Sequence, residues 1–188
     1  MRVEFLGSFP DAAMMPDTGL GEVAFIGRSN VGKSSLLNAI AGQAVARVSQ
    51  TPGRTQMINM FRLDGKTVLV DLPGYGYAKA SKADVAAWQD MMRGYLGARA
   101  ALRQVLLLID SRHGAKQIDL DFMAALDKSA VAYALVLTKI DKIKDPDAVV
   151  KAAEALAAKH PACFPSVFAT SAEKKMGIKE VRDLATGK

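Results

Sequence analysis

A glycine-rich string near the start of the chain has the residue types and spacing to bind phosphate. Gly27 and Gly32 enclose four residues, and Lys33 and Ser34 follow directly. In a G-x-x-x-x-G-K-S loop, glycine lets backbone N–H groups approach phosphate oxygens closely, and the following helix N-terminus adds positive potential. The lysine reaches the β- and γ-oxygens, and the serine hydroxyl is a magnesium ligand. The predicted nucleotide-binding loop comprises Gly27, Arg28, Ser29, Asn30, Val31, Gly32, Lys33 and Ser34.

A second candidate is the string Asp71, Leu72, Pro73 and Gly74, which closes a short apolar run. The Asp71 carboxylate can hold magnesium through water, and the Gly74 amide can bind the γ-phosphate. Gly76 follows closely and makes the segment pliable, which suits a conformational switch. We predict that this string also contacts the nucleotide.

A third candidate, Thr138, Lys139, Ile140 and Asp141, resembles the guanine-reading N-K-x-D motif, with threonine in place of asparagine. The Asp141 carboxylate can accept hydrogen bonds from the N1–H and 2-amino groups of guanine, which adenine lacks. Lys139 can lay its methylene groups over the purine ring. Thr138 is shorter than asparagine, so we expect it to brace the phosphate loop less well. Thr170, Ser171 and Ala172 resemble the loop whose alanine amide contacts guanine O6.

The string Thr51-Pro52-Gly53-Arg54-Thr55 lies between the first two candidates. Such switches place here a threonine that ligates magnesium and binds the γ-phosphate. We choose Thr55 over Thr51 because it stands at the entry to a predicted strand, and we expect Gly53 and Arg54 to contact the nucleotide. The predicted metal ligands are Ser34, Thr55 and Asp71. The predicted catalytic residues are Lys33, Asn30, Thr55 and Gly74.

The elements that position these motifs follow an α/β pattern. Short apolar runs rich in β-branched residues alternate with longer helical patterns, which is typical of βαβ units in a largely parallel sheet with helices on both faces. The expected strands are Glu22–Gly27, Met57–Leu63, Thr67–Asp71, Arg103–Asp110, Ala132–Thr138 and Ser166–Thr170. The expected helices are Lys33–Ala41, Lys82–Leu96, Gln117–Lys128, Asp147–Lys159 and Ile178–Ala185.

A hairpin is expected around Asp64-Gly65, because alternating runs flank this pair. It makes one strand antiparallel, so the six-stranded sheet is mixed, with one antiparallel edge. Residues 1–19 contain Pro10 and Pro16 and lack strong periodicity beyond Val3–Phe9, so we expect an arm packed on the domain. Residues 20–188 form the domain itself.

Composition indicates one globular domain. The chain has 188 residues, half of them hydrophobic, and a formal net charge of +6. This charge favours a polyanionic partner such as RNA or reflects a solvated surface, and the sequence leaves both open. No apolar run reaches the roughly 20 residues that span a bilayer, so we expect a cytoplasmic protein. The single Cys163 has no partner for a disulfide or metal site, and we expect a buried, inert thiol.

Three strings together resemble the bacterial EngB (YihA/YsxC) family of ribosome-biogenesis GTPases. They are Gly27–Ser35, Thr51–Gln56 and Asp71-Leu-Pro-Gly-Tyr-Gly-Tyr-Ala-Lys79, supported by Trp88 and Thr-Lys-x-Asp. The resemblance spans nearly the whole chain. It implies a three-layer P-loop NTPase (small GTPase, G-domain) fold and a monomer that binds GTP, GDP and Mg²⁺. It also implies a switch in late assembly of the large (50S) ribosomal subunit, with that subunit's precursor as partner and a link to cell division and septation.

Two features bear on catalysis. Tyr75 follows Gly74, where many GTPases have a water-orienting glutamine, so we predict slow hydrolysis without an activator. Asn30 matches an asparagine that helps to hold potassium in cation-activated GTPases, and K⁺ is therefore a possible activating ion. The alternative role for Asn30 is to brace the loop. The alternative function for the protein is a GTP-binding adaptor in cell division with little catalytic activity of its own.

Several residues receive no single assignment from sequence. We expect His113 in a surface loop and give His160 no chemistry. Trp88, Met91, Met92 and Tyr95 share one helical face, which is core or an RNA-stacking platform. The cations near this helix form a basic face or a solvated one; they are Lys79, Lys82, Arg93, Arg99 and Arg103.

Overall fold

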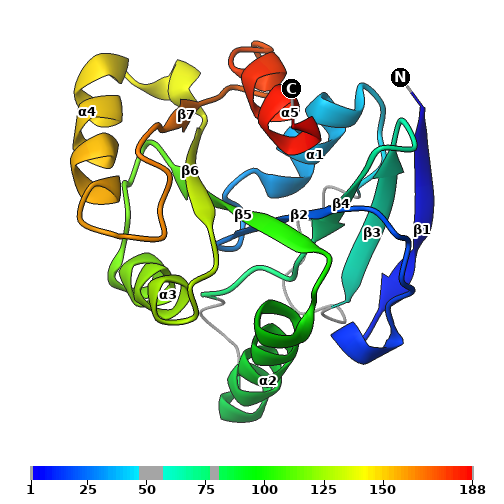
Figure 1. The fold of residues 1–188 in the computed structure, drawn as a ribbon. Coiled ribbons are helices and arrows are strands. Elements are labelled where there is room, and N and C mark those ends of the chain that lie inside the picture. Colours follow the sequence, from blue (N-terminus) through cyan, green and yellow to red (C-terminus); the bar gives the residue numbers. More distant parts are fainter. Residues whose placement is uncertain (1, 47–56, 77–80, 188) are drawn as a thin grey trace.

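One mixed sheet organises the molecule. The computed structural model describes residues 2–46, 57–76 and 81–187, and within these ranges the strand order is β1-β3-β4-β2-β5-β6-β7 (Figure 1). The strands are β1 (Val3–Phe9), β2 (Glu22–Gly27), β3 (Ile58–Leu63), β4 (Thr67–Asp71), β5 (Leu102–Asp110), β6 (Tyr133–Thr138) and β7 (Phe168–Ala169). The helices are η1 (Ala12–Met14), α1 (Lys33–Ala41), α2 (Lys82–Ala98), α3 (Gln117–Lys128), η2 (Ile140–Lys142), α4 (Pro146–Ala157) and α5 (Ile178–Thr186).

The predicted fold class is confirmed, with seven strands instead of six. β1 pairs antiparallel with β3, from Val3 opposite Leu63 to Phe9 opposite Ile58. β3 is therefore the one strand, among those described, that runs opposite to the others. We expected β3 at the edge of the sheet, but β1 lies outside it and forms that edge. A bulge between Phe5 and Gly7 interrupts the register. Val3–Phe9 is the stretch of the expected arm that shows periodicity in the sequence, and in the structure it is β1 with the same bounds. The bulge and the exposed edge weaken its alternation of apolar residues, so the sequence predicted an arm there and not a strand.

The expected hairpin joins β3 and β4. Asp64 and Gly65 both have left-handed backbones, with φ of 51° and 68°, and the Lys66 amide donates to the Leu63 carbonyl at 3.0 Å. Two successive positive φ angles are the signature of the type I′ turn, which matches the right-handed twist of the flanking strands. The turn thus fixes the register of the reversed strand.

Alternate residues of each central strand feed two cores on opposite faces of the sheet. In β2, Ala24 and Ile26 face α2, α3 and α4, whereas Val23 and Phe25 face α1 and α5. Figure 1 shows these two helical layers on either side of the strands. All residues of β2, β4 and β6 are buried, as expected for strands covered on both faces. No described helix has the length and apolar content to cross a membrane.

Helix α2 buries few of its side chains. It has 17 residues, of which Met92 and Tyr95 are buried. Its start is fixed by a capping box, because the Ser81 hydroxyl accepts from the Asp84 amide while the Asp84 carboxylate accepts from the Ser81 amide. The capping box therefore stabilises the start of a helix whose buried side chains lie along one narrow stripe.

Candidate functional site

The predicted phosphate loop joins β2 to α1 in the strand–loop–helix context that its chemistry requires. Asn30 and Gly32 have positive φ angles of 62° and 102°. A Cβ on Gly27 would lie 2.8 Å from the Leu108 carbonyl oxygen and 2.9 Å from a Val31 methyl group. Glycine is therefore needed at position 27 for the loop to lie against β5.

The string 71–74 lies directly beside this loop. The Tyr75 amide donates to the Gly27 carbonyl at 3.2 Å, and the Ser29 amide donates to the Tyr75 carbonyl at 2.9 Å. These bonds form a parallel bridge between Arg28 and Tyr75. Gly74 packs so closely that a Cβ there would lie 3.0 Å from the Gly27 oxygen. The structure thus brings two of the predicted strings together through backbone pairing.

Lys33 and Asp71 meet at the centre of this arrangement. The Lys33 ammonium contacts Asp71 Oδ1 in a largely buried ion pair, and Asn59 Nδ2 lies 3.4 Å from Asp71 Oδ2. Ser34 follows Lys33 in the helix, so the lysine has a hydroxyl group and the Asp71 carboxylate as neighbours. Hydroxyl and carboxylate oxygens suit Mg²⁺, which is commonly held by one or two protein oxygens together with phosphates and water. The described residues contain no cluster of three or more His, Cys, Asp or Glu that could hold an ion by itself.

The two predicted guanine-binding strings line one cavity of about 190 Å³. The Ile140 amide donates to the Thr170 carbonyl at 3.1 Å, and the Thr170 amide donates to the Leu137 carbonyl at 2.7 Å. These bonds join strings that are some 30 residues apart in the chain. The cavity is lined by Gly32, Ser35, Leu36, Thr138, Lys139, Asp141, Lys142, Thr170, Ser171, Ala172 and Glu173.

Asp141 has the properties of a guanine-reading group. Its side chain is 7% exposed, and Lys142 Nζ lies 3.1 Å from Oδ2, yet among the described residues Oδ2 accepts no hydrogen bond. A hydrogen bond from Ser171 is the main cause that lowers the pKa of this carboxyl, so it is ionised at neutral pH. An ionised carboxylate whose buried Oδ2 accepts no hydrogen bond within the described residues fits the paired N–H donors of guanine.

Thr138 braces the phosphate loop, contrary to our expectation of a weaker contact. Its hydroxyl donates to the Val31 carbonyl at 2.6 Å, and the Ile109 carbonyl lies at 3.3 Å. The shorter side chain reaches because β6 and the loop approach closely at this point. Nearby, Lys139 Nζ donates to the Asn30 carbonyl and to Asp110 Oδ2, both at 2.8 Å. The base-reading string and the phosphate loop are therefore linked at two points.

Sequence analysis missed Asp110, which organises this junction. It ends β5 and is 4% exposed. Burial opposes its ionisation, but hydrogen bonds from Arg112 and Lys139 outweigh it and hold the pKa well below its usual range. The charge on Asp110 thus fixes Lys139 beside the loop. Its position at the end of a predicted strand, two residues before Arg112, is the feature of the sequence that could have identified it.

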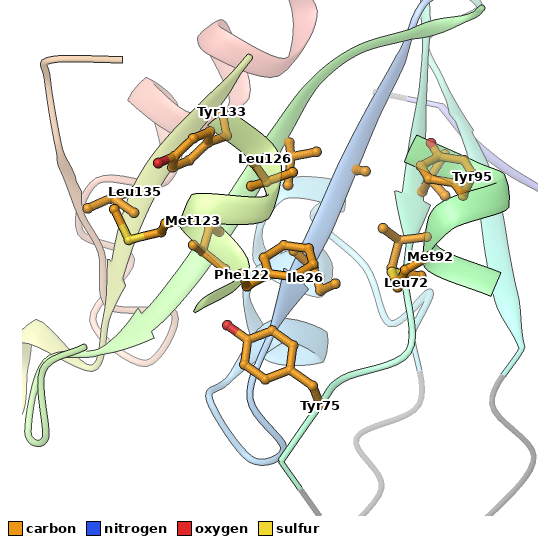
Figure 2. Packing of buried hydrophobic residues seen from close by; sticks show 14 of the residues in the cluster. Ile26, Leu72, Tyr75, Met92, Tyr95, Phe122, Met123, Leu126, Tyr133 and Leu135 are labelled. Atoms are coloured by element: carbon orange, nitrogen blue, oxygen red, sulfur yellow. The ribbon is translucent and has the colours of Figure 1, made fainter. Parts of the chain in front are cut away.

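Tyr75 points away from the phosphate loop. Its hydroxyl donates to Asp119 Oδ1 at 2.6 Å, and Arg28 Nε lies 3.3 Å from Asp119 Oδ2. Its ring packs against Phe122 and, edge-on, against Trp88; Figure 2 shows Tyr75 with Phe122 inside the cluster. Burial, followed by the charge of Asp119, raises the pKa of Tyr75. Position 75 therefore anchors the segment and has no side chain at the phosphate end.

The remaining expectations have mixed outcomes. Five residues singled out in the sequence lie outside the described residues; they are Thr51, Gly53, Arg54, Thr55 and Lys79. His113 is exposed in a turn, and His160 Nδ1 lies 2.6 Å from Asp127 Oδ2. Cys163 is half-buried instead of buried.

The helical stripe that includes Trp88 belongs to the core. Met92 and Tyr95 are buried, and Trp88 and Met91 pack against them. Of the two alternatives left open for the cations near this helix, a basic face or a solvated one, neither describes Arg99, which donates to Oε1 of the buried Glu22 at 2.6 Å. Arg93 is exposed but paired with Asp90.

Comparisons with known proteins agree with this geometry. A family model described as "50S ribosome-binding GTPase" matches residues 22–139. The chain is 49% identical over 184 residues to a probable GTP-binding protein EngB of Bradyrhizobium diazoefficiens, covering 95% of this chain and 85% of that protein. It is 53% identical to a probable EngB of Caulobacter vibrioides, covering 89% and 75%.

A crystal structure of a probable GTP-binding protein engB has the same fold, with a TM-score of 0.69 at 22% identity, covering 87% of this chain and 95% of that one. The chain belongs to the EngB family of P-loop GTPases.

Proposed function

We propose that the protein is a GTP-dependent switch that acts in late assembly of the large ribosomal subunit. The observation that carries the nucleotide part is the convergence of three strings on one site, with an ionised Asp141 whose Oδ2 accepts no hydrogen bond within the described residues. In this proposal the phosphate-loop amides and Lys33 bind the phosphates, while Thr138–Asp141 and Thr170–Ala172 bind the base. The bound nucleotide is GTP or GDP, and the protein is a cytoplasmic monomer.

Ser34, Thr55 and Asp71 are the proposed magnesium ligands. Mg²⁺ held by these residues would neutralise phosphate charge. Asp71 is paired with Lys33 in the described residues; if Lys33 bound the phosphates instead, the Asp71 carboxylate would be free to hold Mg²⁺ through water. In the proposal the amide of Gly74, a residue that packs against the loop backbone, binds the γ-phosphate.

Slow hydrolysis follows from the position of Tyr75. Because its hydroxyl is bound to Asp119, it does not orient an attacking water, and another group must supply this help. Asn30 is exposed, and no hydrogen bond from its side chain is present in the described part of the chain. This favours the potassium role over loop bracing, which here uses the Asn30 carbonyl.

Turnover in equal concentrations of K⁺ and Na⁺, with and without large subunits, tests the potassium proposal. We expect faster hydrolysis in K⁺, and Asn30→Ala should remove the difference. Equal turnover in both salts under both conditions would sink it.

Nucleotide-dependent cosedimentation with the large-subunit precursor tests the ribosomal proposal. The net charge of +6 and the matching family, described as a 50S ribosome-binding GTPase, support it. We expect tighter binding with a non-hydrolysable GTP analogue than with GDP, and a steep fall in affinity with salt because rRNA contacts release counterions. Equal binding in both states, or no salt dependence, would contradict the proposal.

The second candidate is a GTP-binding adaptor in cell division, favoured by the inward-turned Tyr75. Single-turnover hydrolysis on purified large subunits separates the two functions. Acceleration supports the assembly switch and its proposed link to septation. An unchanged rate with intact GTP binding supports the adaptor.

A further inference from the structure

An apolar groove runs between α2 and α3, away from the nucleotide-binding cavity. Its volume is about 610 Å³, within the usual range of ligand and peptide sites. The α2 wall carries Val85, Trp88, Met92 and Leu96, and the α3 wall carries Ile118 and Phe122. On each helix these residues recur at helical spacing, so each wall is one continuous stripe.

The groove is open to solvent. Val85 and Ile118 are 45% and 41% exposed, and they are two of the six large hydrophobic side chains exposed in the described residues. Trp88 and Phe122 form the deeper part and pack against each other at a centroid distance of 6.0 Å. Exposed apolar residues that rim a deep aromatic floor are typical of a binding groove, whereas scattered ones are not.

The groove is joined to the segment predicted to switch. Gly74, Tyr75 and Gly76 line one end of it, and Trp88 Nε1 donates to the Pro73 carbonyl at 2.9 Å. Any movement of residues 73–76 must therefore move the tryptophan or break this bond. The shape of the groove depends on the conformation of this segment.

Charge at the rim indicates which partner fits. Of the charged residues that line the groove, Asp84 and Asp121 are acidic, and Arg93 is paired with Asp90. Neither Asp84 nor Asp121 has a cationic partner among the residues that the structure describes. The rim is thus acidic on a chain whose net charge is +6, which opposes the phosphates of RNA and favours lysine or arginine.

We propose that the groove between α2 and α3 binds an amphipathic helix of a protein partner, with aliphatic side chains on one face and lysine or arginine beside them. The anchors enter between Val85 and Ile118 and reach Trp88 and Phe122, as in other helix-in-groove complexes. The affinity depends on the bound nucleotide through Pro73 and Trp88. This dependence rests on the proposed GTP switch, whereas the groove itself does not.

The test uses the full chain, ¹⁵N-labelled and GDP-loaded, with a synthetic probe. The probe is a helical peptide of about 16 residues with leucine at i, i+3, i+4 and i+7 and lysines flanking that face. A second peptide has glutamate in place of each lysine. We expect the lysine peptide to shift amide signals of α2 and α3 around Val85 and Ile118, and to bind more tightly than the glutamate peptide.

Ile118→Lys places a cation at the rim and should weaken binding of the lysine peptide about tenfold or more. Phe164→Lys is the matched control, because Phe164 is also exposed, at 50%, but lies outside the groove; it should leave binding unchanged. Circular dichroism melts verify that both variants fold. Equal binding by Ile118→Lys and Phe164→Lys, or equal affinity for the two peptides, would overturn the proposal.

Two further arms separate the alternatives. A single-stranded rRNA fragment that shifts the same groove signals would identify a nucleic-acid surface and overturn the proposal. Repeating the titration with a GTP analogue should change the peptide affinity. If the peptide affinity is equal in both nucleotide states and Ile118→Lys still weakens binding, the coupling through Pro73 and Trp88 is refuted, but peptide binding in the groove is not.

Discussion

In the proposed function, the carboxylate of Asp141 selects the base. Asp141 is buried, ionised and without a donor at Oδ2 in the described part of the chain. Leaving such a group unpaired costs free energy, so a ligand that supplies two N–H donors is favoured over one that supplies an acceptor. Discrimination against adenine therefore needs no steric exclusion.

Asp141→Asn tests this directly. The amide can no longer accept both bonds from guanine, so affinity for GTP should fall about 100-fold or more, as expected for two hydrogen bonds to a charged group. Xanthine has a carbonyl where guanine has the 2-amino group, so affinity for XTP should rise. Fluorescent-nucleotide titration measures both. Glu173→Gln, which alters an exposed carboxylate at the same cavity, should change neither by more than about threefold.

Tyr75→Phe removes one hydroxyl and leaves the ring packing intact. The Asp119 carboxylate, which has no exposed surface, then retains the Lys116 amide and Arg28 as partners. We expect the free energy of unfolding to fall by about 1–3 kcal/mol, as measured by urea denaturation. Intrinsic GTP hydrolysis should stay within about threefold, a barrier change below 1 kcal/mol, because the hydroxyl faces α3.

Tyr133→Phe is a suitable comparison for this variant, since its bond to Asp127 is longer, at 3.4 Å. Its loss of stability should be smaller. A Tyr75→Phe protein as stable as the parent, or one whose hydrolysis collapses, would show that the hydroxyl does not act as an anchor.

Cys163 gives a prediction for alkaline pH. Burial raises its pKa to about 11, above the value of about 8.5 for a free thiol. The folded state therefore binds this proton more tightly, and the stability it contributes is complete below pH 8.5 and is lost as the pH rises through 11. Urea denaturation between these values should show declining stability, with a shallower decline for Cys163→Ala. Parallel pH profiles for the two proteins would contradict the assignment.

At the scale of elements, the joint between β6 and the phosphate loop rests on Thr138. Thr138→Val keeps the shape but removes the donor to the Val31 carbonyl. One buried hydrogen bond is worth about 1 kcal/mol, so GDP affinity should fall about fivefold. Titration with a fluorescent GDP analogue measures it.

Thr67→Val is the control for Thr138→Val. The Thr67 hydroxyl is also buried and donates to the Gly21 carbonyl at 3.1 Å, at the opposite end of the sheet from the nucleotide site. It should lower stability and leave GDP affinity unchanged. If the two variants bind GDP equally well, Thr138 has no bracing role.

Elements whose signals are local were predictable from sequence. The bounds of β2, β4, α1 and α3 agree with expectation because each is fixed by a turn, a cap or an uninterrupted apolar run. The three site strings were predictable for the same reason: each is a contiguous motif after a strand. β1 was recognised only as a periodic stretch of the arm and not as a strand, because a bulge interrupts the alternation of this edge strand.

What sequence could not reveal are contacts between distant residues. Tyr75 meets Asp119 across 44 positions, and Arg99 meets Glu22 across 77. Neither pair has a local pattern, since only the fold brings the partners together. Both are buried polar contacts. They direct the Tyr75 side chain toward the core, and they draw Arg99 away from the basic or solvated face that the sequence left open.

At the scale of the molecule, one ion pair joins three separate parts. Glu22 begins β2 with its side chain fully buried, and it accepts from Arg99 at the end of α2 and from the Tyr95 hydroxyl at 3.0 Å. Arg99 also donates to the Met15 and Pro16 carbonyls at 3.3 and 2.6 Å. The central strand, the helix that follows the predicted switch and the N-terminal segment are thereby tied at one point.

Arg99→Leu leaves the Glu22 carboxylate buried without its cation, which should lower the free energy of unfolding by about 3–5 kcal/mol. Urea denaturation measures the loss, and limited proteolysis near Pro16 should accelerate because two carbonyls lose their donor. Arg93→Leu breaks an exposed pair in the same helix and should cost about 0–1 kcal/mol. The double variant Glu22→Gln with Arg99→Leu should recover part of the stability, because no unpaired charge remains. If Arg99→Leu costs no more than Arg93→Leu, then Tyr95 and packing hold α2 in place, and the ion pair is incidental to the fold.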